Sequence, residues 1–421
     1  MSNWERKRLG DISNSCLGKM LDKSKNKGEF QPYLANLNVQ WGEFKLGSLQ
    51  KMRFKEGEED RYGVKLGDLI VCEGGEPGRC AIWRDELPNI KIQKALHRVR
   101  VHSEYCSDFL FYRMLQAGRN KEFDRHFIGS TIKHLTGIGL KDVEFEFPDL
   151  EKQKSISSVL RVLDKKIELN NKINAELEAM TKLIYDYWFV QFDFPDANGK
   201  PYKSSGGKMV YNETLKREIP EGWADGTLAD IAELVRGVTY SKDDIAEKGA
   251  TGTVPILRAT NISGHEIDLD DMVYVPESFV SKKQMLNRYD VLITMSSGSK
   301  EHIGKNGFFY FEDSVSFGAF CAKLVAKDGL QYYLYSYTQS ELMFSTIKNE
   351  CLGTNINNLN SSLVYGFKIV SPEKDLVQKF NDHVDTIFKK IGSNQKENWK
   401  LIELRDWLLP MLMNGQVTVN S

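Results

Sequence analysis

Two short stretches of the chain contain residues of the types found in active sites, one as a nucleophile and one as a phosphate-binding loop. Ser297 and Lys300 have the Ser-x-x-Lys spacing of acyl-serine enzymes, but the companion motifs of those enzymes are missing and the stretch follows a strand-like run as a turn would. Residues 74–78, GGEPG, could cradle a phosphate, yet they lack the Gly-Lys-Ser/Thr ending and carry Glu76 where the anion would sit. We interpret both stretches as turns, and the sequence predicts no catalytic residue.

Metal and cofactor sites are not indicated either. The six cysteines contain no Cys-x-x-Cys pair, and the seven histidines show none of the usual metal spacings. The sequence has no Asn-Pro-Pro-aromatic signature of a methyltransferase and no glycine-rich cofactor loop after an early strand. We therefore expect the chain to hold no metal and no cofactor of its own.

The overall composition is that of a globular protein with many charged residues but almost no net charge. The chain has 421 residues, of which 41% are hydrophobic and 27% charged, enough for two or three domains with their own cores. It has no run of about 18 apolar residues and no hydrophobic stretch near its start, so we expect a cytoplasmic protein. A net charge of −1 means that any contact with nucleic acid must be local or shared with other subunits.

Basic and hydroxyl side chains gather in loops where they could contact DNA. One basic loop lies within residues 18–28 and a second polar loop within residues 236–242, although charge runs are often only solvated faces. Arg79 and Lys300 lie in comparable turns, where each could contact phosphate or guanine or remain a solvated cation. These loops predict local DNA contact on an otherwise neutral chain.

Two asparagines complete the set of candidates. Asn38 and Asn261, at matched positions, could pair with adenine edges or stabilise turns. The candidate DNA-contacting residues are Lys19, Lys23, Lys25, Lys27, Asn38, Arg79, Arg236, Thr239, Tyr240, Lys242, Arg258, Asn261 and Lys300.

These loops belong to a chain that repeats itself. GSTIKHL at residues 129–135 returns as GTNINNL at residues 353–359, an offset of 224 residues (353 − 129), and Pro148 and Pro372 share that offset. A repeat of this length is not a solenoid unit, whose period is about 20–50 residues. The sequence therefore predicts a duplicated module in which a mixed α/β domain of short β-rich runs and glycine turns is followed by a helix.

A heptad pattern of apolar residues follows each predicted domain. It covers residues 149–189 and about 375–414, with Lys, Glu and Asn at the flanking positions. Such stripes often pack onto their own domains, but two stripes of equal length in one register favour pairing with each other. The residues expected in this pairing are Ile156, Leu160, Leu163, Ile167, Asn170, Asn174, Leu177, Ile184, Phe380, Val384, Ile387, Ile391, Asn394, Asn398, Leu401 and Leu408.

Asparagines lie near the middle of both stripes. In an antiparallel pairing Asn170 and Asn174 would face Asn394 and Asn398, and such a polar layer fixes the register at some cost in stability. The same arrangement would place the two domains at opposite ends of helices about 60 Å long.

The composition changes at the end of the first helix. Tyr185, Tyr187, Trp188, Phe189 and Phe192 could stack on bases, or could anchor the helix end against the other domain or a partner subunit. The residues that follow collect Gly, Ser, Pro and Lys without periodicity, which is typical of a linker.

The order of domain, helix, linker, domain and helix, with GSTIKHL and GTNINNL closing the domains, resembles the DNA-specificity subunit of type I restriction-modification enzymes. The phrases NGKPYKSSGGKMV and IPEGW are similar to the central region of that family, and PDLEKQ at residues 148–153 matches its helix start more closely than PEKDL at residues 372–376. The resemblance covers essentially the whole chain.

The resemblance implies an α+β protein with pseudo-two-fold symmetry. Two homologous α/β target-recognition domains, residues 1–147 and 223–371, would be joined by two long spacer helices, residues 148–190 and 372–415, that pair as an antiparallel coiled coil, and residues 191–222 would form the linker. The protein would be a non-catalytic subunit that reads a bipartite, asymmetric DNA target. It would dock two methyltransferase subunits and restriction subunits, which would hold the S-adenosylmethionine, ATP and magnesium.

Two alternatives from other classes remain open on the residues alone. One is a single-chain methyltransferase or nuclease with tandem recognition domains, which the missing cofactor motif disfavours. The other is a coiled-coil scaffold that does not bind DNA.

Overall fold

The computed structural model describes residues 4–22, 24, 26–352, 358–417 and 419. The chain folds into two compact units, one formed by Met1–Glu168 with Trp399–Ser421 and the other by Leu169–Asn398. We call them unit 1 and unit 2. Both long helices, α5 and α10, contribute residues to both units, so the second half of each helix belongs to a different unit from the first half.

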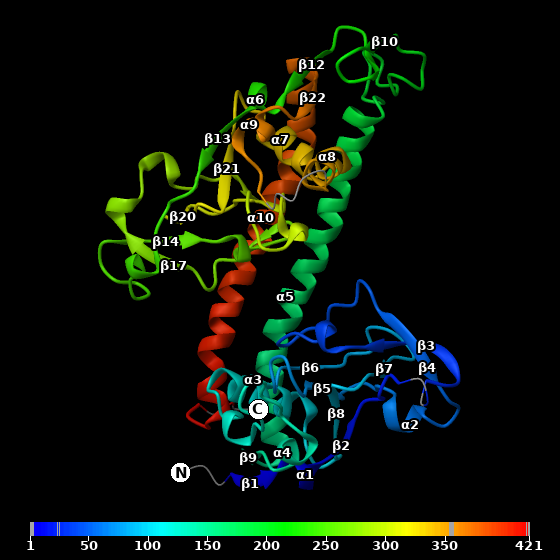
Figure 1. Cartoon of the computed structure of the whole chain (residues 1–421), viewed down its shortest axis with the longest axis vertical. Coiled ribbons are helices and arrows are strands. Elements are labelled where there is room, and N and C mark those ends of the chain that lie inside the picture. The colour runs from blue at the N-terminus through cyan, green and yellow to red at the C-terminus, as the bar shows by residue number, and fades with distance from the viewer. Residues whose placement is uncertain (1–3, 23, 25, 353–357, 418, 420–421) are drawn as a thin grey trace. The chain divides into compact units, whose positions relative to one another are not determined.

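Unit 1 is built around a four-stranded antiparallel sheet with the strand order β2-β8-β5-β6. The central strand β5 has the sequence LIVC and is buried along its whole length, because both faces of the sheet are covered. Leu69 and Val71 share a core with residues of α3, whereas Ile70 and Cys72 share a core with residues of a second sheet, β4-β3-β7. Figure 1 labels the strands of both sheets. The strands are β2 (Ser13–Leu17), β3 (Glu29–Leu34), β4 (Gln50–Phe54), β5 (Leu69–Cys72), β6 (Cys80–Ile82), β7 (Lys91–Ile92) and β8 (Leu96–Val101).

A two-stranded ribbon and short helices complete unit 1. The ribbon pairs β1 (Glu5–Arg8) with β9 (Glu144–Phe147) and brings the start of the domain beside its end. The helices are α1 (Leu9–Ile12), α2 (Glu59–Tyr62), α3 (Ser107–Arg119) and α4 (Gly137–Lys141).

Unit 2 repeats these three sheets in the same strand order and adds a short pair, β15-β16. Its sheets have the orders β13-β21-β18-β19 and β17-β14-β20, and β12 pairs with β22 as β1 pairs with β9. In both units the second sheet contains one antiparallel and one parallel pair. The predicted duplication of an α/β domain is therefore confirmed.

The bounds of the elements in this second copy follow the same order along the chain. The strands are β12 (Ala224–Thr227), β13 (Ala232–Arg236), β14 (Thr253–Leu257), β15 (Ile262–Ser263), β16 (Glu266–Ile267), β17 (Val273–Pro276), β18 (Val291–Thr294), β19 (Asn306–Phe308), β20 (Ser316–Phe317), β21 (Cys321–Ala326) and β22 (Lys368–Ser371). The helices are α6 (Leu228–Ile231), α7 (Gln331–Thr338), α8 (Glu341–Leu352) and α9 (Ser361–Tyr365).

The heptad segments form α5 (Leu150–Tyr185) and α10 (Lys374–Met413), and the turn after α10 contains Gly415 at φ +66°. Asp149 caps the start of α5, since its Oδ1 accepts a hydrogen bond from the backbone nitrogen of Lys152 at 2.9 Å. A buried Gln153 ties that first turn to domain 1 by accepting a hydrogen bond from the backbone nitrogen of Cys106 at 2.9 Å. The first turn of α5 is therefore fixed by both its cap and its domain.

The two long helices pack against each other and against the domain of the same unit. In unit 1, Ile156 and Leu160 of α5 share a core with Leu409 and Leu412 of α10 and with α3, and Arg405 pairs with Asp164 at 3.0 Å. In unit 2 the residue numbers of contacting partners also rise along α5 as they fall along α10, so the pairing is antiparallel. The remaining stripe residues lie half-buried or buried: Leu163, Ile167, Leu401 and Leu408 in unit 1, and Leu177, Ile184, Phe380, Val384, Ile387 and Ile391 in unit 2.

The asparagines of the stripes meet within unit 2. Asn170 Nδ2 donates to Asn398 Oδ1 at 2.9 Å, and Asn394 Nδ2 donates to Asn174 Oδ1 at 2.8 Å. All four side chains are buried. Within the apolar seam, these amides can only be satisfied when the helices hold one register.

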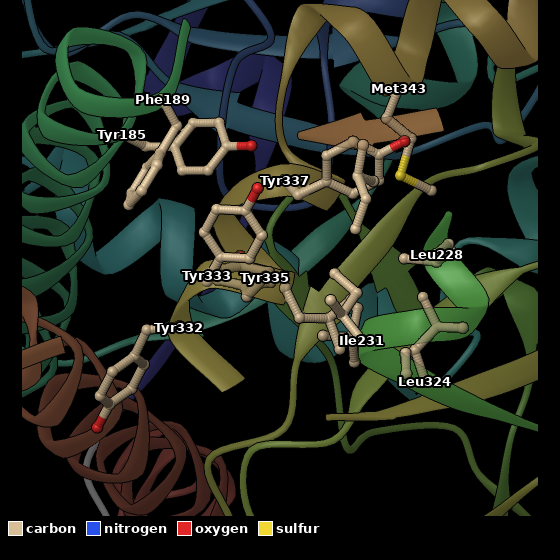
Figure 2. Close-up of a cluster of buried hydrophobic side chains, with 14 of the residues drawn as sticks. Tyr185, Phe189, Leu228, Ile231, Leu324, Tyr332, Tyr333, Tyr335, Tyr337 and Met343 are labelled. Carbon is tan, nitrogen blue, oxygen red and sulfur yellow. The ribbon is translucent and has the colours of Figure 1, made fainter. Parts of the chain in front are cut away.

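Residues 191–222 contain an ordered hairpin of β10 (Met209–Asn212) and β11 (Arg217–Pro220). The aromatic group at the end of α5 anchors to the core of unit 2, where Tyr185, Trp188, Phe189 and Phe192 are buried. Figure 2 shows Tyr185 and Phe189 beside Tyr333 of α7, with Tyr332 pointing to α10, where its hydroxyl donates to Asp385 at 2.7 Å. This group therefore serves as an anchor to the second domain, and its buried rings do not form a platform for bases.

Candidate nucleic-acid interface

Four loops of unit 1 meet at one edge of its four-stranded sheet, and backbone hydrogen bonds connect them. The nitrogen of Lys94 donates to the oxygen of Lys19 at 2.8 Å, and that of Glu73 donates to the oxygen of Ala95 at 2.8 Å. The nitrogen of Leu135, the last residue of GSTIKHL, donates to the oxygen of Glu73 at 2.7 Å. We call residues 17–19, 73–79, 92–95 and 128–135 the loop edge of unit 1.

Unit 2 has the same edge with the same backbone bonds. The nitrogen of Ala319 donates to the oxygen of Val238 at 2.9 Å, that of Met295 to the oxygen of Phe320 at 2.8 Å, and that of Leu359 to the oxygen of Met295 at 2.7 Å. Residues 236–240, 295–300, 317–320 and 358–359 form the loop edge of unit 2. Residues 353–357, which begin the second motif, lie outside the described residues.

The repeated motif therefore has a structural explanation in its final leucine. Leu135 and Leu359 are both fully buried, and the backbone nitrogen of each donates to the oxygen of the residue that follows a central strand, Glu73 after β5 and Met295 after β18. In unit 1 the loop before Leu135 is a tight hairpin, in which Ile128 and His134 exchange backbone hydrogen bonds at 2.9 Å. Gly129 adopts φ +105°, and an added Cβ would lie 2.2 Å from the oxygen of Ile132. Glycine is thus required to present the exposed tip of the hairpin.

Several predicted DNA-contacting residues are exposed and free of acidic partners. Arg236 and Thr239 lie at the loop edge of unit 2, and Lys300 follows its strand-end turn. The guanidinium of Arg236 contacts only the oxygen of Ala319, at 3.4 Å, and no carboxylate in the described part of the chain pairs with it. Lys27 and Lys242 are also exposed, in the loops that follow β2 and β13.

Lys19 does not fit the predicted role, because its side chain is buried. It is 2% exposed, and its Nζ donates to the oxygen of Arg53 at 2.9 Å and to Glu58 Oε2 at 2.5 Å. Burial opposes ionisation of Glu58, yet the hydrogen bond from Lys19 lowers the pKa of that carboxyl. The matched backbone bonds show that Lys19 occupies the position that the buried Val238 holds in unit 2. Lys19 therefore forms a structural ion pair with Glu58.

Asn38 and Asn261 are turn residues rather than base readers. Asn38 Oδ1 accepts from the nitrogen of Ala35 at 2.9 Å while its Nδ2 donates to the oxygen of Lys45. Asn261 repeats both bonds, with the nitrogen of Arg258 and the oxygen of Asp270. Both amides are buried, and each binds two backbone groups of its own turn, which favours the turn role over contact with adenine.

Other candidates are held by internal partners or cannot be placed. Arg79 contacts Glu76 at 3.1 Å and Asn36 Oδ1 at 2.9 Å, and Arg258 contacts Asp271 at 2.6 Å. Tyr240 is half-buried, and Lys23 and Lys25 lie outside the described residues.

The structure adds exposed residues that sequence reasoning missed. Phe320 is 68% exposed at the loop edge of unit 2, and Lys94 and Lys133 are exposed at that of unit 1. Lys133 lies inside the repeated motif, which could have identified it. No local pattern identifies Phe320. Its position follows from its backbone oxygen, which accepts from the nitrogen of Met295 as the oxygen of Ala95 accepts from the nitrogen of Glu73 in unit 1.

The chemistry of these edges is that of binding. Ser297 Oγ accepts a hydrogen bond from the nitrogen of Ser299 at 3.3 Å, as in a turn. Over the described ranges, no group of three His, Cys, Asp or Glu residues could hold a metal ion. Within the same ranges, no helix is both long and apolar enough to cross a membrane.

The fold and the two loop edges define a duplicated binding protein with paired spacer helices. A family model described as the type I restriction modification DNA specificity domain matches residues 1–179 and 220–402. The chain belongs to this family, and as a specificity subunit it is a non-catalytic protein of DNA recognition.

Individual relatives agree with this assignment. The type I restriction enzyme MjaIX specificity subunit of Methanocaldococcus jannaschii is 28% identical over 359 residues, covering 84% of this chain and 78% of the relative. The HindI specificity subunit of Haemophilus influenzae is 23% identical over 478 residues. The alignment covers 99% of this chain and 100% of that relative. A type I S subunit structure from M. genitalium shares the fold, with a TM-score of 0.53 and 18% identity over 98% of this chain and 96% of that one.

Proposed function

We propose that each loop edge reads one half of a split DNA sequence, within a cytoplasmic complex that also contains two methyltransferase subunits and restriction subunits. The observation that carries this proposal is the pair of loop edges, which share their backbone bonds but differ in the exposed side chains. Two loop edges with the same backbone structure but different exposed side chains could each recognise a different half-site. The relatives named above are specificity subunits of type I restriction enzymes, which supports the assignment of partners.

The DNA contacts are assigned to the exposed cations and polar residues of the loops. Lys27 in unit 1 and Arg236, Lys242 and Lys300 in unit 2 have no acidic partner among the described residues and can neutralise phosphates. Thr239 lies between Arg236 and Lys242 in the sequence and can contact a base edge. Since the chain carries a net charge of −1, tight binding requires basic surface from the methyltransferase subunits, which would also hold S-adenosylmethionine; ATP and magnesium would serve the restriction subunits.

Exchange of one domain tests the proposal directly. Residues 1–147 are replaced by the corresponding domain of another specificity subunit, and the methylated sequence is mapped in a genome that carries the chimera with its methyltransferase. We expect one half of the target to change and the other half to remain. A change in both halves, or methylation without sequence preference, would show that the two edges do not read separately.

A further inference from the structure

A cavity of about 340 Å³ lies inside unit 2, away from its loop edge. Side chains from α5, α7, α10 and the turn between β15 and β16 line it. Its volume lies at the low end of the range of small-ligand sites.

One wall of the cavity carries a hydroxyl group without a partner. Ser336 of α7 is 7% exposed, and its Oγ forms no hydrogen bond with any described residue. A buried polar group left unsatisfied destabilises a fold, so such groups are uncommon in native proteins. The oxygen itself is closed off from the solvent-sized space of the cavity, so a ligand reaches it through rotation of the Ser336 side chain.

A second lining residue carries a carboxyl group without a cation. Glu178 of α5 is half-buried, and its side chain forms no ion pair within the described part of the chain. Burial raises the pKa of this carboxyl to about 7, and the charge of Glu266 on β16 acts in the same direction. The cavity therefore contains an acid that lacks a counter-ion.

The remaining lining is aromatic or already engaged. Tyr335 and Phe388 contribute rings, and Gln339 donates to Asn306 Oδ1 at 2.6 Å. Burial lowers the pKa of His265, while its hydrogen bond with Gln339 acts in the opposite direction. The lining cation Lys182 is paired with Asp186 on its own helix.

We propose that this cavity binds a primary ammonium group on a short alkyl chain. The carboxylate of Glu178 is the counter-ion, the hydroxyl of Ser336 accepts a hydrogen bond from the ammonium, and the rings of Tyr335 and Phe388 enclose the alkyl chain. The aromatic walls and the absence of a three-ligand group among the described residues favour an organic cation over a metal ion.

A bound amine would join α5 to the second domain. Glu178 belongs to the spacer helix, whereas Ser336 and His265 belong to the domain that the helix supports. Amine binding favours the ionised form of Glu178, so affinity increases as the pH rises through 7 and then levels off. The other charged groups around the site are Glu266, which favours a cation, and the Lys182–Asp186 pair.

Calorimetric titration of the full chain with 1-aminobutane and 1,4-diaminobutane tests the proposal. The titrations are carried out at pH 7 in two buffers of different ionisation enthalpy, with 1-butanol as the uncharged control. We expect both amines to bind, 1-butanol not to bind, and about half a proton to be released per amine, because Glu178 is about half protonated at that pH.

Three variants identify the groups that bind the amine. Glu178→Gln should weaken binding about tenfold or more and abolish proton release, since it removes the counter-ion. Ser336→Ala should weaken binding by a few fold without lowering thermal stability. Glu176→Gln, an exposed position on the same helix, should behave like the wild type.

Two results would overturn the proposal. The first is the absence of amine binding to the folded wild-type chain at millimolar concentration. The second is binding with unchanged affinity and proton release in Glu178→Gln.

Discussion

Asn394 donates a hydrogen bond to Asn174 across the paired helices, with 2.8 Å between the two side-chain atoms. The other half of each amide, Asn174 Nδ2 and Asn394 Oδ1, is buried and has no partner among the described residues. The neighbouring pair is better satisfied, because Asn398 accepts from Asn170 and also donates to Asn171 at 2.5 Å. The Asn174–Asn394 layer therefore costs stability while it restricts the register of the helices.

Replacing both members of that layer by leucine should stabilise the protein. The double variant Asn174→Leu with Asn394→Leu removes two unsatisfied groups and adds apolar contact, so we expect the free energy of unfolding to rise by about 1–3 kcal/mol. Each single variant should lower it by about 1–3 kcal/mol, because the remaining amide loses its only partner. Urea denaturation of the four proteins measures the coupling. Additive effects of the two substitutions would contradict this account.

Lys19 and Arg236 should separate stability from DNA binding. Lys19→Met leaves Glu58 without its partner, so we expect unfolding to become easier by about 1–3 kcal/mol while the DNA affinity of the folded complex stays unchanged. Arg236→Gln should leave stability unchanged, weaken DNA binding by about three- to tenfold and reduce the salt slope by about one. Fluorescence anisotropy over a salt series, with the methyltransferase present, measures the second effect. Loss of DNA affinity in Lys19→Met alone would reverse the assignment.

Gly129→Ala should distort the repeated hairpin. The substitution combines a left-handed backbone with a Cβ placed 2.2 Å from the oxygen of Ile132, so we expect a loss of at least about 2 kcal/mol. Gly57→Ala is a matched control, because Gly57 also has a positive φ, +83°, but no heavy atom near the added Cβ. The control should cost only about 1 kcal/mol. Equal losses in thermal denaturation would mean that the close approach has no effect.

Glu178→Gln should reduce the pH dependence of stability. A carboxyl whose pKa rises on folding, here from an ordinary 4.5 to about 7, stabilises the fold below pH 4.5, and this stability is lost as the pH rises through 7. The variant should therefore match the wild type near pH 4 and exceed it at pH 8, by on the order of 3 kcal/mol. Urea denaturation at both pH values checks this, with Glu176→Gln as control. An identical pH dependence of wild type and variant would show that Glu178 is ionised freely in the folded chain.

The fold could be predicted from the sequence where the signal was periodic or repeated. The duplication followed from GSTIKHL and GTNINNL, whose last leucines, Leu135 and Leu359, are buried at equivalent places. The paired helices followed from heptads, because burial along a helix recurs with a fixed period. The family resemblance implied the antiparallel direction, and the asparagines near the middle of each stripe were expected to meet in it, as Asn170 meets Asn398.

The individual contacts of the loops could not be predicted in the same way. Lys19 belongs to a basic run that looks solvated, and only the fold brings Glu58 and the oxygen of Arg53 to it. The sequence allowed Asn38 either to stabilise a turn or to contact a base. Its hydrogen bonds to the backbone of Ala35 and Lys45 favour the turn, and the positions of these backbone atoms depend on the whole loop. The role of a residue in a loop without a periodic sequence pattern depends on partners that are distant in the sequence.

The matched bonds of the two loop edges join main-chain atoms, as between Lys94 and Lys19 or between Ala319 and Val238. A bond of this kind does not depend on which side chain its residues carry, so exposed positions at the edges can be substituted with little change in folding energy. Most mutations destabilise a protein, and selection removes those that take it below the stability it needs to function. This selection against destabilising mutations is weak at the exposed positions of the loop edges. Descendants of this chain could therefore acquire a new DNA preference through successive single substitutions, and the variant at each step would still fold.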